Sequence, residues 1–180
     1  DEVPFEARLE RYGLDFGYDP DPAAIIAIYR FNNGYILDEV LYGKRLSNET
    51  LAGALKNLPT ALVIADSAEP KSIDELRRLG VNITGAEKGA ESVRYGVKTL
   101  QAQRISVTKR SLNLIHEQRN YFQAVDRKTN IPIMGMYEGE NHCLDAARYA
   151  ICSMIPIIQR RERFAAIPHF NNQPRVNPAV

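Results

Sequence analysis

Three consecutive stretches near the start of the chain predict β-strands, the second because it is rich in β-branched residues and the third because hydrophobic and polar residues alternate in it. The stretches are RYGLDF (11–16), AIIAIYR (24–30) and GYILDEVLY (34–42). Alternation with a period of two is typical of half-buried strands. Asn32-Asn33-Gly34 stands between the last two stretches, and such a sequence favours a tight hairpin turn. We therefore expect an antiparallel meander in this part of the chain.

From Ser47 onwards the pattern changes to short apolar strands that alternate with helices. A helix is predicted from Ser47 to Pro59, and TALVIA (60–65) is a continuous apolar run of the kind found in strands buried on both faces. Further elements are predicted as helices from about 70 to 80, over 91–103, over 111–120 and from about 141 to 155, as strands at 81–84 and 105–108, and as a hairpin over 121–136. A meander joined to such crossovers predicts an α/β fold, with a mixed β-sheet of antiparallel and parallel strands and helices on both faces.

Composition places the chain among ordinary globular proteins. It has 180 residues, of which 44% are hydrophobic and 25% charged, enough for one sizeable core. No stretch reaches the roughly 20 apolar residues of a membrane-spanning helix, so no membrane partner is expected. We expect an N-terminal lead-in or linker over 1–10, one domain over 11–158, and a basic, mobile C-terminal tail over 159–180.

The formal net charge of +1 conceals an uneven distribution of charged residues. Residues 1–22 carry seven acids against two bases (−5), whereas residues 92–128 carry eight bases against two acids (+6). An acidic cluster beside a basic segment suits a metal-dependent enzyme that acts on phosphodiesters, although solvated helix faces give the same counts. The candidate contacts to a nucleic-acid backbone are Lys88, Arg94, Arg104 and Lys109.

Three aspartates stand at the end of, or within, strongly apolar predicted elements. Asp15 ends the first predicted strand, Asp66 ends the apolar strand, and Asp145 lies in the last predicted helix. A carboxylate at the end of a buried strand is costly unless it is paired or bound to metal. Mg²⁺ and Mn²⁺ prefer oxygen ligands, and two such ions can clamp the attacking and leaving oxygens of a phosphoryl displacement. We predict that these three side chains are catalytic and hold one or two Mg²⁺ or Mn²⁺ ions.

Two further residues are candidates for the same site. At roughly 100° per residue, His142 projects within about 60° of Asp145 on one helix face. It can ligate a metal ion or relay a proton, although a histidine hydrogen-bonded near a helix start produces the same pattern. Asp21 stands six residues after Asp15 and is a candidate ligand of a second metal ion, or else a turn former.

Four segments resemble a known family. They are Leu14-Asp15-Phe16-Gly17 with a following Asp-Pro pair, Ile64-Ala65-Asp66-Ser67-Ala68-Glu69-Pro70-Lys71-Ser72, Gly85-Ala86-x-Lys88-Gly89-x-x-Ser92-Val93-x-x-Gly96, and Asn141-His142-x-x-Asp145-Ala146-x-Arg148-Tyr149. In this order, over about residues 11–155, they are similar to the C-terminal nuclease domain of the large terminase subunit of tailed bacteriophages. The resemblance implies an RNase H-like fold and a two-metal endonuclease that cuts double-stranded viral DNA concatemers during genome packaging.

By the same resemblance, Asp15, Asp66 and Asp145 would bind the metal ions, with His142 beside them. The implied partners are double-stranded DNA held without sequence preference, an ATPase motor domain, the portal and the small terminase subunit. The implied location is the cytoplasm of the infected bacterial host, at the procapsid portal. Two alternatives stay open: a junction resolvase or transposase-type nuclease with the same fold, and a non-catalytic DNA-binding or docking module.

Overall fold

Eight strands and five helices form the part of the chain that the computed structural model describes, residues 2–87 and 92–155. In chain order they are β1 (Arg8–Asp15), β2 (Ala23–Phe31), β3 (Gly34–Gly43), α1 (Asn48–Lys56), β4 (Leu62–Ala65), α2 (Pro70–Arg78), β5 (Ile83–Gly85), α3 (Ser92–Gln101), β6 (Ile105–Val107), α4 (Leu112–Asn120), β7 (Phe122–Val125), β8 (Pro132–Glu138) and α5 (His142–Ser153). Every element predicted from the sequence is present, with its ends shifted by a few residues.

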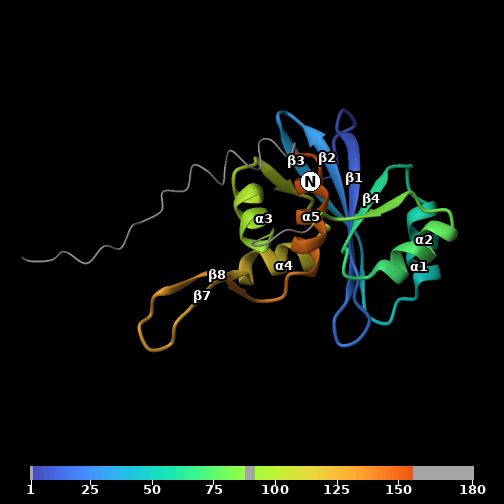
Figure 1. Cartoon of the computed structure of the whole chain (residues 1–180). Coiled ribbons are helices and arrows are strands. Elements are labelled where there is room, and N and C mark those ends of the chain that lie inside the picture. The colour runs from blue at the N-terminus through green and yellow to red at the C-terminus, as the bar shows by residue number, and fades with distance from the viewer. Residues whose placement is uncertain (1, 88–91, 156–180) are drawn as a thin grey trace, which may run out of the picture.

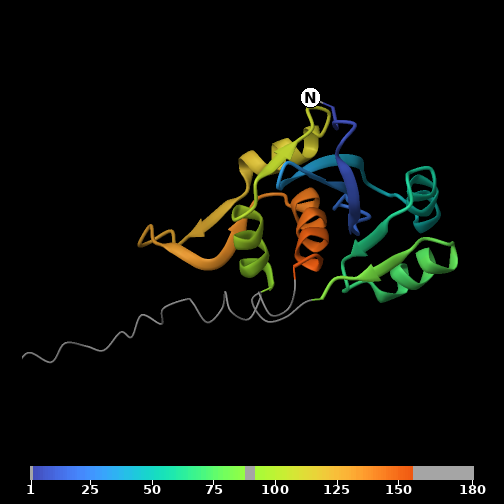
Figure 2. The ribbon, with the colours of Figure 1, turned by 90° about the horizontal axis from the view of Figure 1, so that it is seen from above.

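Six of the strands form one mixed sheet in the order β5-β4-β1-β2-β3-β6. The meander β1–β2–β3 is antiparallel, whereas β1/β4, β4/β5 and β3/β6 pair in parallel, which confirms the predicted mixed sheet. Asn32 and Asn33 turn the β2–β3 hairpin with φ angles of 44° and 59°. Both residues are thus left-handed, as the predicted tight turn requires. Strands β7 and β8 form a separate hairpin that projects from the body (Figures 1 and 2).

Helices cover both faces of the large sheet (Figure 1). On one face, α1 and α2 bury a core that includes Leu14, Leu51 and Leu76. On the other face, α5 packs on β1 and β2 and buries Ile26, Leu114 and Ile151, while α3 and α4 pack against α5 (Figure 2). The interior is therefore split by the sheet into two apolar layers, as expected for strands buried on both faces.

Helix α5 approaches β1 with almost no side chain between the two backbones. A Cβ atom placed on Gly13 would overlap the carbonyl group of Ala146 in α5. Arg11 donates a hydrogen bond of 2.8 Å to Ser153 Oγ, so the end of α5 lies beside the first half of β1. The first turn of α5 consequently lies at the carboxyl end of β1.

The parallel pairings have one consequence for the position of chemical groups. Strands β1, β3, β4, β5 and β6 all run in one direction, so their carboxyl ends gather at one end of the sheet. In sheets of this kind, ligands bind outside the carboxyl ends of the strands. None of the helices in the described residues is long and apolar enough to cross a membrane. The predicted tail over 159–180 lies outside the described residues.

Candidate functional site

The three predicted aspartates come together at this end of the sheet. Asp15 is the last residue of β1, Asp66 directly follows the neighbouring parallel strand β4, and Asp145 lies in the first turn of α5. The Asp66 amide donates a 3.1 Å hydrogen bond to the Leu14 carbonyl, which extends the pairing of the two strands to the acids. Burial raises the pKa of Asp15, and the negative charges of Asp145 and Asp66 raise it further. The acids therefore act on one another electrostatically.

Asp15 is paired with His142. The carboxylate is only 8% exposed, and its Oδ2 lies 3.1 Å from Nδ1 of the imidazole. Since an ionised carboxylate can only accept, Nδ1 carries the hydrogen in this pair. The hydrogen bond to Asp15 raises the pKa of His142 against the opposing effect of burial. The other ring nitrogen, Nε2, lies 3.9 Å from Oδ1 of Asp21, which is otherwise exposed. The structure thus brings both further candidates to the site.

Asp66 is held by Tyr149 and by its own loop. The Tyr149 hydroxyl donates to Oδ2 over 3.2 Å, and the Ala68 amide donates to Oδ1 over 2.8 Å. Tyr149 is buried, and its pKa is raised first by burial and then by the charges of Asp145, Asp15 and Asp66. The charges of all three carboxylates therefore act on this one phenol.

Asp145 is paired with Arg148, three residues later on α5. Nε and Nη2 of the guanidinium lie 3.0 Å from Oδ1 and 2.9 Å from Oδ2, so each carboxylate oxygen accepts one hydrogen bond. The Arg148 side chain is 6% exposed, and its guanidinium carbon lies 4.6 Å from the centre of the Tyr149 ring. Although burial lowers the pKa of Arg148, the hydrogen bond to Asp145 and its charge outweigh this and raise it.

Each acid of the cluster is therefore engaged by a residue of α5: His142 for Asp15, Tyr149 for Asp66 and Arg148 for Asp145. In this arrangement, and within the described ranges, no three His, Cys, Asp or Glu side chains are grouped as ready ligands of a metal ion. The donor set nevertheless fits a hard divalent cation, because carboxylate oxygens are its preferred ligands and the mutual repulsion seen at Asp15 favours added positive charge.

Sequence reasoning missed Glu117, a fully buried carboxylate on α4. Its Oε2 accepts a 3.0 Å hydrogen bond from the Leu144 amide, while Asn141, the residue before α5, makes no capping bond with its side chain. Glu117 therefore caps the helix that carries His142 and Asp145. The signal in the sequence is its position three residues after Leu114, on the face of α4 that points inward.

The predicted nucleic-acid contacts do not form one group. Lys109 follows β6 and thus lies at the same end of the sheet as Asp15, and Arg94 lies in the first turn of α3. Arg104 precedes β6 and lies at the opposite end, where its carbonyl accepts from the Tyr35 amide. Lys88 lies outside the described residues.

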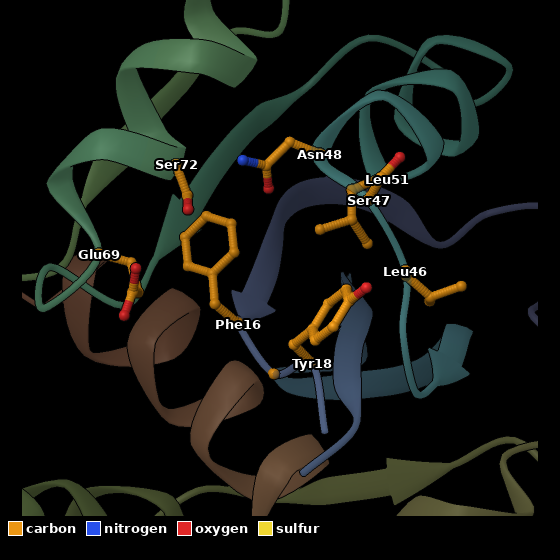
Figure 3. Close-up of a pocket in the computed structure, with 9 residues that line it drawn as sticks. Phe16, Tyr18, Leu46, Ser47, Asn48, Leu51, Glu69 and Ser72 are labelled. Carbon is orange, nitrogen blue, oxygen red and sulfur yellow. The ribbon is translucent and has the colours of Figure 1, made fainter. Parts of the chain in front are cut away.

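A cavity of about 340 Å³ opens on the other side of the end of β1 (Figure 3). Phe16 and Tyr18 line it from the segment after β1. Ser47 and Asn48 line it from the start of α1, and Glu69 and Ser72 from the start of α2. Successive residues of a strand point to opposite faces. Asp15 accordingly points towards α5 and Phe16 into the cavity, so the cavity is separate from the acidic cluster.

Comparison with known proteins gives consistent matches. A family model described as "Terminase RNAseH like domain" matches residues 15–153. The large terminase subunit of Bacillus phage SPP1 is 39% identical over 148 residues, which cover 78% of this chain and 35% of that protein. The PBSX phage terminase large subunit of Bacillus subtilis (strain 168) is 30% identical over 146 residues, covering 78% of this chain and 34% of that protein.

A solved structure matches as well. The nuclease domain of the large terminase of bacteriophage SPP1, determined with bound Mn, aligns with a TM-score of 0.70 and 33% identity, covering 81% of this chain and 86% of that one. The RNase H-like fold expected from the sequence is thereby confirmed. The chain spans about a third of the length of the two curated relatives.

Proposed function

Since the chain belongs to the family of terminase RNase H-like domains, we propose that it is a divalent-metal-dependent endonuclease that cleaves double-stranded DNA during viral genome packaging. The observation that carries the proposal is the meeting of Asp15, Asp66 and Asp145 at the carboxyl ends of two parallel strands, under one helix. Membership in the family supports a nuclease role, and the bound Mn of the SPP1 domain supports the use of a divalent metal there.

Asp15, Asp66 and Asp145 would hold one or two Mg²⁺ or Mn²⁺ ions. Such ions activate the attacking water and stabilise the leaving oxygen of a phosphodiester. The residues of α5 orient the ligands: Nδ1 of His142 fixes the carboxylate of Asp15, and the Tyr149 hydroxyl fixes that of Asp66. His142 also leaves Nε2 directed towards Asp21, so this imidazole is suited to take up or release a proton at the edge of the site.

The DNA would be held through its phosphates rather than its bases. Lys109 lies at the same end of the sheet as the acids, and Arg94 lies in the first turn of α3. Basic side chains of this kind bind phosphates without reading sequence. We therefore propose that binding tolerates any sequence and weakens steeply with salt. We also propose that the chain acts together with an ATPase motor domain, the portal and the small terminase subunit, in the cytoplasm of the infected host. The two curated relatives are about three times as long as the matched region, and this additional length supports the proposed ATPase motor domain.

The test is Mn²⁺-dependent cleavage of supercoiled plasmid by the purified chain and by Asp66→Asn. The variant keeps the shape of the side chain and one acceptor oxygen but removes its charge, so we expect a folded protein with no cleavage. Asp74→Asn, in an exposed ion pair on α2, is the matched control and should retain full activity. Full activity of Asp66→Asn would refute the assignment. A four-way junction as a second substrate separates packaging-type cleavage of linear duplex from a resolvase.

A further inference from the structure

Gly96 and Arg148 form a contact that the proposed chemistry leaves unexplained. Gly96 lies in the middle of α3, where it is buried, and a Cβ atom at this position would overlap Cγ and Cδ of Arg148. The absence of a side chain at residue 96 thus makes room for the stem of Arg148 against α3. From there the guanidinium reaches both oxygens of Asp145.

The environment makes this ion pair different from a surface pair. Asp74 and Arg77 on α2 have the same spacing, but their side chains are 60% and 54% exposed. The Arg148 and Asp145 side chains are 6% and 19% exposed. Water screens the charge of Arg77, whereas the charge of Arg148 acts at close range on the acidic cluster.

The geometry points to Arg148, seated against Gly96, as a built-in counter-ion that weakens the binding of divalent cations at Asp145. The inference rests on the proposed metal-dependent function. With one lone pair on each Asp145 oxygen occupied by the guanidinium, a metal ion must use the remaining lone pairs beside a positive charge or displace Arg148. Either course costs affinity. Arg148 is thus a positioning residue that sets how much free metal is needed before Asp145 becomes a ligand.

The three acids differ in the kind of group that engages them. Asp15 and Asp66 are engaged by groups that share or donate a hydrogen, but Asp145 is engaged by a permanent cation. Arg148 keeps its charge at every ordinary pH, so the Arg148–Asp145 pair opposes a divalent ion by direct charge repulsion. Tyr149 is neutral in its pair with Asp66, and His142 repels a cation only when it is protonated.

The test is isothermal titration of Mn²⁺ into the purified chain without DNA, so that the readout is metal affinity rather than cleavage. In Arg148→Gln we expect binding at least about tenfold tighter, because the repulsion between a unit charge and a divalent ion at close range exceeds this even at an effective dielectric constant of about 20. The matched control Arg77→Gln removes the same charge from a pair of the same spacing and should bind Mn²⁺ like the wild type.

A second variant removes no charge but displaces one. Gly96→Ala pushes the stem of Arg148 away from α3, and we expect it to tighten Mn²⁺ binding as well, by a smaller factor. Circular dichroism checks that each variant is folded, and if Arg148→Gln does not fold, Gly96→Ala decides. Unchanged or weaker Mn²⁺ binding in the folded variants overturns the inference, since Arg148 would then be neutral or would prepare Asp145 for the metal. A wild-type chain that binds no Mn²⁺ refutes the proposed function itself.

Discussion

Replacement of Gly13 by alanine tests how closely α5 lies against β1. Gly13 does not have a positive φ angle, so the backbone of β1 accepts alanine without strain. The only obstacle is the new methyl group, which would overlap the backbone carbonyl of Ala146. A helix backbone cannot rotate aside as a side chain can, so α5 must shift as a whole.

The expected cost follows from this geometry. Overpacking a well-packed core costs about 1–3 kcal/mol, and contact with backbone places Gly13→Ala at the upper end of this range. The lower entropy of the unfolded alanine variant returns about 0.4–1 kcal/mol. The net loss in the free energy of unfolding is therefore about 2–2.6 kcal/mol, or roughly 4–10 °C in Tm for a domain of this size.

The assay is thermal unfolding followed by circular dichroism, with Gly53→Ala as the control. Gly53 lies inside α1, and a Cβ atom there meets nothing within 4 Å. Alanine is the better helix former, so this variant should gain about 0.5–1 kcal/mol. The two substitutions are chemically identical and are expected to have opposite signs. A Gly13→Ala protein that melts at or above the wild-type temperature would refute the close packing of α5 on β1.

Substitutions at three other residues test hydrogen bonds by urea unfolding. Glu117→Ala removes the cap of α5 and should cost about 1–2 kcal/mol, whereas Glu117→Gln keeps an acceptor oxygen and should cost less; equal losses would contradict the cap. Ser47→Ala removes the hydrogen bond from the Thr50 amide at the start of α1 and should cost about 1 kcal/mol; an unchanged urea midpoint would contradict this cap. Asp38→Ala removes the buried acceptor of both the Thr108 hydroxyl and the Arg110 guanidinium and should cost about 1–3 kcal/mol; a neutral effect would show that these bonds contribute nothing.

The periodic part of the fold could be predicted because local chemistry decides it. The Asn32-Asn33 turn, the serine cap at Ser47 and the apolar run 60–65 each depend on a few neighbouring residues. The turn and the cap are present, and the strand within the run spans Leu62–Ala65. The acids at the strand ends could be predicted for the same reason, since each lies at a boundary between apolar and polar sequence.

The partners of those acids could not be predicted, because they depend on how α5 is rotated over the sheet. His142 shares its helix face with Asp145 in the sequence pattern, yet in the structure it pairs with Asp15, 127 residues away. Glu117 acts on α5 from another helix, and no local pattern links the two. Contacts of this kind follow from tertiary packing, on which a single sequence carries little information.

The place of α5 in the order of synthesis has a further consequence. Asp15 and Asp66 are translated before the helix that supplies Asp145, His142, Arg148 and Tyr149. A chain that stops before residue 142 holds two of the three acids but lacks the α5 residues that engage them. Within the described residues, the helix made last is therefore also the one that assembles the cluster.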